Sequence, residues 1–173
     1  MPDPIASIAV HGEWVRHAPH RAPLLGRKER STSGRWQRDG VVRGLYLADT
    51  AQTAIAEWYR WLAERAMSPG ARVPHDHHRW EVALDVADLS SPERLAAAGL
   101  TIPRPSRATW PPFQEVGEQL WRDGWRGVLA PSAARPDSRV LCIFCDTWPP
   151  GGCFPLDAEE IREVPPPPLG MTT

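Results

Sequence analysis

The stretch Gly34–Glu64, GRWQRDGVVRGLYLADTAQTAIAEWYRWLAE, decides the fold prediction. It begins as a loop, continues as the apolar strand 44–48, turns within two residues and becomes a helix that reaches Glu64. The loop carries Arg35, the strand carries Tyr46 and the helix carries Glu57. One short unit therefore brings a guanidinium, a phenol and a carboxylate together.

Further strands and helices are predicted on both sides of this unit. Alternating or strongly apolar runs predict strands at Glu13–His17, Arg79–Val86, Gly127–Ala130 and Arg139–Cys145. Capping residues and helical spacing predict helices that start after Asp49-Thr50, at Ser91 and at Phe113. We expect residues 18–43 and 67–78 to be loops, and Arg139–Cys145 to be a central strand.

Length and composition indicate a single domain. The chain has 173 residues and 20 prolines, and domains run roughly 100–200 residues. We expect residues 1–11 to form an N-terminal arm, 12–164 one domain, and 165–173 an extended, mostly solvated tail with four consecutive prolines. The strands do not alternate regularly with long helices, which argues against a doubly wound parallel sheet.

Charge and targeting signals narrow the class of partner. The net charge is −1, so nothing favours direct binding to nucleic acid or to an anionic membrane. No apolar run approaches the ~20 residues that span a bilayer, and no secretory signal is visible. Three cysteines without such a signal predict reduced thiols in the cytoplasm.

Each candidate residue also has an ordinary structural explanation. Glu57 lies beside the apolar stripe of its helix, where a surface residue and a site carboxylate are equally expected. Arg35 alone is best explained as a loop arginine that pairs with a carbonyl or a surface acid. Tyr46 in a strand is more often a core residue, and Ser132 after a proline is more often a turn residue.

The sequence gives little support for a metal site or for a known nucleotide-binding motif. The histidines His75, His77 and His78 fall in a predicted loop, where adjacent imidazoles seldom share one ion, so we predict no metal site. Cys142 and Cys145 have C-x-x-C spacing, but three residues apart in a strand they face opposite sides. No Walker loop, G-x-G-x-x-G or G-x-S-x-G motif is present.

Five pieces in order nevertheless resemble the RES-domain family, the NAD-consuming toxins of bacterial toxin–antitoxin pairs. The pieces are Trp14-Val15-Arg16, Ser33-Gly34-Arg35-Trp36-Gln37, Leu45-Tyr46-Leu47-Ala48, Thr53-Ala54-Ile55-Ala56-Glu57, and Pro131-Ser132-Ala133 after Gly127-Val128-Leu129-Ala130. The resemblance runs from about residue 12 to 147. Three positions depart from the family pattern: Ser33 replaces a Gly, Gln37 an Asn and His17 a Tyr.

The resemblance implies a fold similar to ADP-ribosyltransferases. That fold is α+β, with two small, mostly antiparallel sheets packed face to face, helices around them and NAD⁺ in the cleft between. It also implies an enzyme that cleaves the nicotinamide–ribose bond of NAD⁺ by hydrolysis or by phosphorolysis, with NAD⁺ as substrate, inorganic phosphate as a candidate co-substrate and no other cofactor. The alternatives are transfer of ADP-ribose to a protein, or a binding module without catalysis. A cognate antitoxin that covers the site is expected, and a homo-oligomer is left open.

The resemblance also assigns roles to six residues. Glu57 would stabilise the charge that develops on the ribose, and Arg16 and Arg35 would hold the diphosphate. Tyr46 would contact the nicotinamide half. Ser132 would bond the ribose or a phosphate, and Trp36 would form a wall of the pocket.

Overall fold

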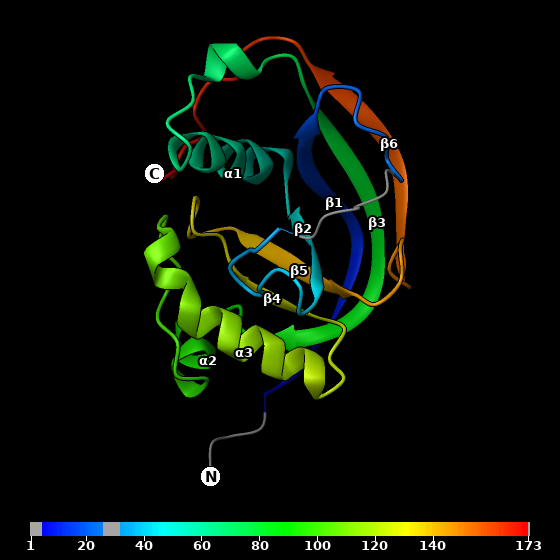
Figure 1. The fold of residues 1–173 in the computed structure, drawn as a ribbon, viewed down its shortest axis with the longest axis vertical. Coiled ribbons are helices and arrows are strands. Elements are labelled where there is room, and N and C mark those ends of the chain that lie inside the picture. The colour runs from blue at the N-terminus through cyan, green and yellow to red at the C-terminus, as the bar shows by residue number, and fades with distance from the viewer. Residues whose placement is uncertain (1–4, 26–31, 173) are drawn as a thin grey trace.

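A computed structural model describes residues 5–25 and 32–172 (Figure 1). In these ranges it contains the strands β1 (Ser7–Pro19), β2 (Arg43–Ala48), β3 (His75–Asp88), β4 (Gly127–Pro131), β5 (Arg139–Cys145) and β6 (Cys153–Ile161). The α-helices are α1 (Ala51–Ala63), α2 (Pro92–Ala97) and α3 (Trp110–Arg122), and two 3₁₀ turns are η1 (Pro69–Arg72) and η2 (Arg107–Thr109). None of the described helices is long and apolar enough to cross a membrane.

The strands form one mixed sheet in the order β1-β2-β5-β4-β3-β6, in which β1 also pairs with β3. Every pairing is antiparallel except that of β3 with β4. Two groups, β1/β3/β6 and β2/β5/β4, are joined through Val15 opposite Ala48 and through residues 87–88 opposite 128–129. The two groups belong to one continuous, strongly curved sheet, because β3 is long enough to reach both (Figure 1). The expected arrangement of two sheets packed face to face is not confirmed.

The mixed α and β class is confirmed, and three strand predictions need correction. β1 already begins at Ser7, inside the segment expected to be an arm. β3 begins at His75, so the histidines predicted to lie in a loop pair with β1 and β6. The strand β6 was not predicted, since Pro155 interrupts its pattern; the sheet accommodates that proline at an edge, beside a register shift between Arg79 and Trp80.

Two hydrophobic clusters lie on opposite faces of the central strands. One contains Trp80 and Ile143 together with Cys145, and the other contains Phe113 and Phe144 together with Cys142. The two cysteines thus lie on opposite sides of β5, as their spacing predicted. β5 lies between β2 and β4, which confirms it as a central strand.

The helices α1 and α3 lie on either side of β4 and β5 (Figure 1). Thr50 caps α1 by accepting a hydrogen bond from the Thr53 amide, in agreement with the predicted cap. α3 starts at Trp110, before the predicted Phe113, since Pro111 and Pro112 occupy its first turn, where their missing N–H groups cost nothing. A cavity lined by both helices reaches residues 46–48 of β2 and residues 15–17 near the carboxyl end of β1.

Candidate active site

A cavity of about 260 Å³ opens where β1, β2, α1 and the loop 32–36 meet. Residues from η2, α3 and the end of β4 complete its wall. Its charged lining residues, among those the structure describes, are Arg16, Arg35, Arg60, Arg65, Arg107, Glu57 and Glu64. Arginines outnumber carboxylates five to two, so the cavity suits an anionic ligand.

Glu57 is fixed through both oxygens of its carboxylate. Oε1 accepts a hydrogen bond from the Ser132 hydroxyl at 2.6 Å, and Oε2 accepts one from Arg60 Nε at 2.7 Å. The side chain is only 14% exposed. Such a carboxylate has a defined direction and little freedom to turn, which is the preorganisation that stabilises developing positive charge.

Ser132 lies behind Glu57 and does not line the cavity. It is fully buried, and its oxygen accepts hydrogen bonds from the amides of Ala134 at 3.2 Å and Arg135 at 3.0 Å. Because both acceptor positions are occupied, its single proton is directed to Glu57. The Ser132 hydroxyl is thus bonded to Glu57, and its bond to the substrate stays a prediction.

Arg16 and Arg35 both line the cavity, but they differ in the hydrogen bonds that their guanidiniums make. Arg35 donates to the Arg104 carbonyl at 2.6 Å and to Thr109 Oγ1 at 3.2 Å, and it lies over the Phe113 ring. Burial lowers the pKa of Arg35 to about 10, so it stays charged at neutral pH. The backbone of Arg16 lies opposite His78 in the sheet, but its guanidinium has no hydrogen bond to another residue in the described part of the chain. Its donors are therefore available to a ligand.

Tyr46 and Trp36 shape the loop as well as the cavity. The Tyr46 hydroxyl accepts from the Trp36 amide at 3.0 Å and donates to Gln37 Oε1 at 2.6 Å, while burial raises its pKa well above the ordinary value. The Trp36 ring is almost fully buried and packs edge-on against Phe113. Both residues line the cavity, and the Tyr46 hydroxyl and the Trp36 amide hold the loop.

The sequence reasoning missed a face of α3 that holds the same loop. Gln114 donates to the Gly34 carbonyl at 2.8 Å. Both carboxylate oxygens of the buried Glu118 accept hydrogen bonds from the Arg38 guanidinium. Between them a Cβ on Gly117 would collide with the Trp36 carbonyl oxygen. The spacing of Gln114, Gly117 and Glu118 puts all three on one side of the helix, but only the structure shows what they face.

The reasoning also missed a group of arginines at the carboxyl end of α1. Arg60 bridges Glu57 and Glu64; burial opposes its charge, but these two carboxylates raise its pKa. Arg107 Nε lies 3.6 Å and Arg65 Nη1 3.8 Å from Glu64 Oε2. Both distances exceed a hydrogen bond. Arg65 Nη1 donates instead to the Trp61 carbonyl at 3.2 Å, which leaves the other N–H groups of its guanidinium as donors for a ligand. The spacing of Arg60 three residues after Glu57 was the one signal in the sequence.

His17 replaces the tyrosine of the family pattern and also lines the cavity. Burial, together with the nearby charges of Arg16 and Arg60, lowers its pKa to about 3. It is therefore a neutral imidazole at neutral pH, and its ring lies 6.0 Å from that of Trp61. The cavity wall at this position is aromatic and uncharged.

The remaining histidines belong to the sheet. His75 stacks on Trp58 at 4.3 Å, and its ring lies 5.5 Å from that of His77. Among the residues that the structure describes, no group of three or more His, Cys, Asp or Glu side chains has the geometry of a metal site.

Comparison with known proteins gives one family match. The model of the RES domain matches residues 8–160, which include Arg16, Arg35, Tyr46, Glu57 and Ser132. The match covers most of the chain.

Two similar curated proteins and one similar solved structure are from mycobacteria. The NAD(+) phosphorylase MbcT of Mycobacterium bovis and of Mycobacterium tuberculosis is 31% identical over 118 residues, which are 66% of this chain and 63% of the relative. The crystal structure of the M. tuberculosis MbcT–MbcA toxin–antitoxin complex has a similar chain, with a TM-score of 0.73 and 25% identity over 90% of this chain and 87% of that one.

Proposed function

Because the chain belongs to the RES domain family, we propose that it is an enzyme that cleaves the nicotinamide–ribose bond of NAD⁺ and transfers the ADP-ribosyl group to inorganic phosphate. The observation that carries the proposal is the carboxylate of Glu57, fixed by Ser132 and Arg60 in a cavity rich in arginine. Phosphate is preferred over water as acceptor because the similar mycobacterial MbcT is named an NAD(+) phosphorylase.

The reaction needs electrostatic stabilisation more than acid catalysis. The bonding electron pair leaves with the pyridinium nitrogen, so nicotinamide departs neutral and no proton is required. Positive charge then develops on the ribose, as in glycoside hydrolysis, and Glu57 is the fixed negative charge that stabilises it. An oxygen of phosphate forms the new bond to the same ribose carbon, which yields ADP-ribose with a phosphate ester at that carbon.

Ser132 and Arg60 act in this scheme through Glu57. Each holds one of its oxygens, so the carboxylate cannot rotate away from the ribose. Arg16 and Arg35 keep the predicted role of holding phosphate oxygens, and Arg65 and Arg107 supply further donors at the other side of the cavity. The ring of Tyr46 faces the nicotinamide half, while its hydroxyl fixes the loop that carries Arg35.

We further propose that the protein is the toxin of a toxin–antitoxin pair and that its antitoxin covers this cavity. The similar chain of M. tuberculosis was crystallised as a toxin–antitoxin complex. We also propose that the strand groups β1/β3/β6 and β2/β5/β4 correspond to the two sheets of an ADP-ribosyltransferase fold, joined here by β3.

The experiment compares nicotinamide release from NAD⁺ in the presence and absence of phosphate. Three proteins are needed: wild type, Glu57→Gln, and Glu159→Gln, whose carboxylate is exposed on β6 and does not line the cavity. We expect phosphate-dependent release by wild type and by Glu159→Gln, and a loss of about 10³-fold in Glu57→Gln. Equal rates for wild type and Glu57→Gln would remove Glu57 from its role.

The same assay separates the alternatives. Phosphate-independent release indicates hydrolysis. Labelling of a protein by radioactive NAD⁺ indicates ADP-ribosyl transfer. Binding of NAD⁺ without release of nicotinamide indicates a module without catalysis.

A further inference from the structure

The segment Pro165–Thr172 lies outside the residues that match the family model, yet it is bonded to both elements that carry the Glu57–Ser132 pair. Tyr59, two residues after Glu57 on α1, donates its hydroxyl proton to the Pro165 carbonyl at 2.6 Å. At the other end, Thr172 donates its amide to the Ala134 carbonyl at 2.7 Å and its hydroxyl proton to the Ala133 carbonyl at 3.0 Å. Figure 1 shows this end of the chain beside α1.

Arg135 connects the same three parts. Its amide donates to Ser132 Oγ at 3.0 Å, its Nη1 donates to Thr53 Oγ1 on α1 at 3.3 Å, and its Nε donates to the Leu169 carbonyl at 3.1 Å. Thr53 lies one helical turn before Glu57. The serine turn, the helix and the segment are thus joined at one guanidinium.

The bonds, rather than burial, hold the segment in place. Leu169 is 90% exposed, and only Pro168 of the segment is buried. Four consecutive prolines favour an extended chain before binding, so little conformational entropy is lost when the segment lies across α1.

We propose that Pro165–Thr172 is a strap that fixes the spacing between α1 and the turn 132–135, and that Arg135 is a positioning residue for Glu57. The Ser132 proton points to Glu57 only while the amides of Ala134 and Arg135 occupy the oxygen of Ser132. The strap holds the carbonyls of that turn and the side of α1 at once, so it sets the direction of the proton and the position of its acceptor. This inference rests on the proposed function.

The first test is kinetic and uses a chain that ends at Val164, together with Arg135→Gln in the full chain. Arg162→Gln, an exposed arginine just before the strap, is the matched control. We expect kcat for nicotinamide release to fall at least about tenfold in both strap variants, with KM for NAD⁺ unchanged, and no effect in the control. A change in KM alone would overturn the proposal.

Combining each variant with Ser132→Ala distinguishes alignment from general stability. If the strap acts through the serine, its loss adds little once the serine hydroxyl is gone, so the effects are not additive. Full additivity would contradict the proposed route.

A second readout does not depend on activity. Amide hydrogen exchange at Ala134 and Arg135, whose N–H groups donate to Ser132, should become faster in both strap variants and stay unchanged in Arg162→Gln. Unchanged exchange in the strap variants would refute the strap even if wild type proved inactive toward NAD⁺. Faster exchange in an inactive wild type would support the strap and reject the proposed function.

Discussion

The hydrogen bonds around Ser132 and Glu57 fix the orientation of both side chains. The serine oxygen is occupied by two backbone amides, so the hydroxyl can only donate, and Glu57 is its acceptor. The carboxylate in turn is held on its other oxygen by Arg60. The serine is fully buried, which supports the proposal that it aligns Glu57.

This geometry makes a prediction for Ser132→Ala. Removal of the hydroxyl leaves Glu57 held only by Arg60, so the carboxylate loses its fixed direction. We expect kcat to fall by about 10² and KM for NAD⁺ to stay nearly constant, as steady-state kinetics can measure. Ser138→Ala, in the same loop, is the control, and an effect of Ser132→Ala confined to KM would mean that the serine binds substrate directly.

His75 makes the stability of the protein depend on pH. Burial, followed by the nearby His77, lowers its pKa to about 4 in the folded protein, against an ordinary value of 6.5. Between these two values the unfolded chain binds a proton that the folded protein does not bind. The free energy of unfolding therefore falls as the pH falls through this window, by about 1.4 kcal/mol for each unit of pKa difference at most.

We expect His75→Phe to reduce this dependence, while His17, whose pKa is lowered to about 3, keeps its own contribution. Phenylalanine keeps the stacking on Trp58, and both His75 nitrogens are buried without a hydrogen-bond partner among the described residues, so little is lost at neutral pH. Chemical denaturation from pH 6.5 down to about 4 measures the effect, with His11→Phe at an exposed position as control. Parallel curves for wild type and His75→Phe would assign the acid sensitivity to other groups.

At the scale of elements, α3 determines where the loop 34–38 lies. Gln114 and Glu118 bond the loop, and Gly117 lets the Trp36 carbonyl approach the helix. Since this loop carries Arg35, the helix contributes to the site although it supplies few of the cavity's polar groups.

Gly117→Ala tests that close contact. Alanine favours a helix by about 1 kcal/mol over glycine, but its methyl group would collide with the Trp36 carbonyl. We expect a net loss of about 1–3 kcal/mol in the free energy of unfolding and weaker binding of NAD⁺. Glu115→Ala, exposed on the same helix, should be neutral, and a stabilised Gly117→Ala protein would show that the helix can withdraw without cost.

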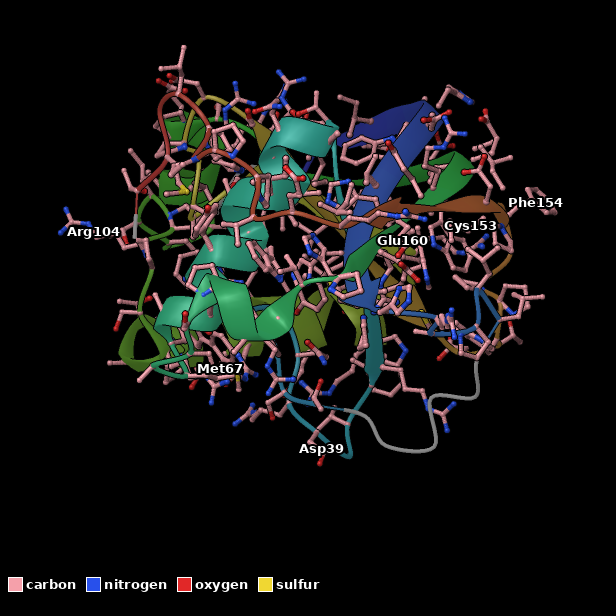
Figure 2. All side chains as sticks on the ribbon, turned by 90° about the horizontal axis from the view of Figure 1, so that it is seen from above. Asp39, Met67, Arg104, Cys153, Phe154 and Glu160 are labelled. Carbon is pink, nitrogen blue, oxygen red and sulfur yellow. The ribbon has the colours of Figure 1, made fainter. Side chains whose placement is uncertain are left out.

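The sequence predicted elements better than their packing. The β2–α1 unit and the helix cap at Thr50 follow from local patterns. The strand β6 could not be found in this way, because an exposed edge strand with a proline has little apolar alternation. Figure 2 shows Phe154 of this strand pointing away from the molecule.

For the candidate site too, the sequence predicted the residues better than the contacts between them. Motif order selected Glu57 and Ser132, but their direct hydrogen bond joins residues 75 positions apart. The contributions of Glu118 and Arg135 depend on such long-range contacts, which no pattern along the chain reveals. Arg60 differs, because it bonds Glu57 three residues before it on the same helix.

At the scale of the whole molecule, the cavity differs in charge from the rest of the chain. The protein carries a net charge of −1, while its cavity has five arginines and two glutamates among the described lining residues. The arginines of the cavity, and not the net charge of the protein, would therefore attract an anionic dinucleotide.

This distribution predicts a dependence on salt. Between ~0.01 M and ~1 M salt the Debye length falls from about 30 Å to about 3 Å, so KM for NAD⁺ should rise while kcat changes little. The double variant Arg65→Gln/Arg107→Gln should have a higher KM at low salt and a weaker salt dependence. A salt effect on kcat at constant KM would argue against arginine contacts that bind the substrate.

The most direct measurement of the central proposal is the identity of the product. Wild-type protein, NAD⁺ and inorganic phosphate are followed by ³¹P NMR. We expect the phosphate and NAD⁺ signals to decrease together, one for one, as a phosphate monoester attached to ADP-ribose appears, and we expect no such change with Glu57→Gln. Free ADP-ribose formed without consumption of phosphate, or no change in NAD⁺ at all, would contradict it.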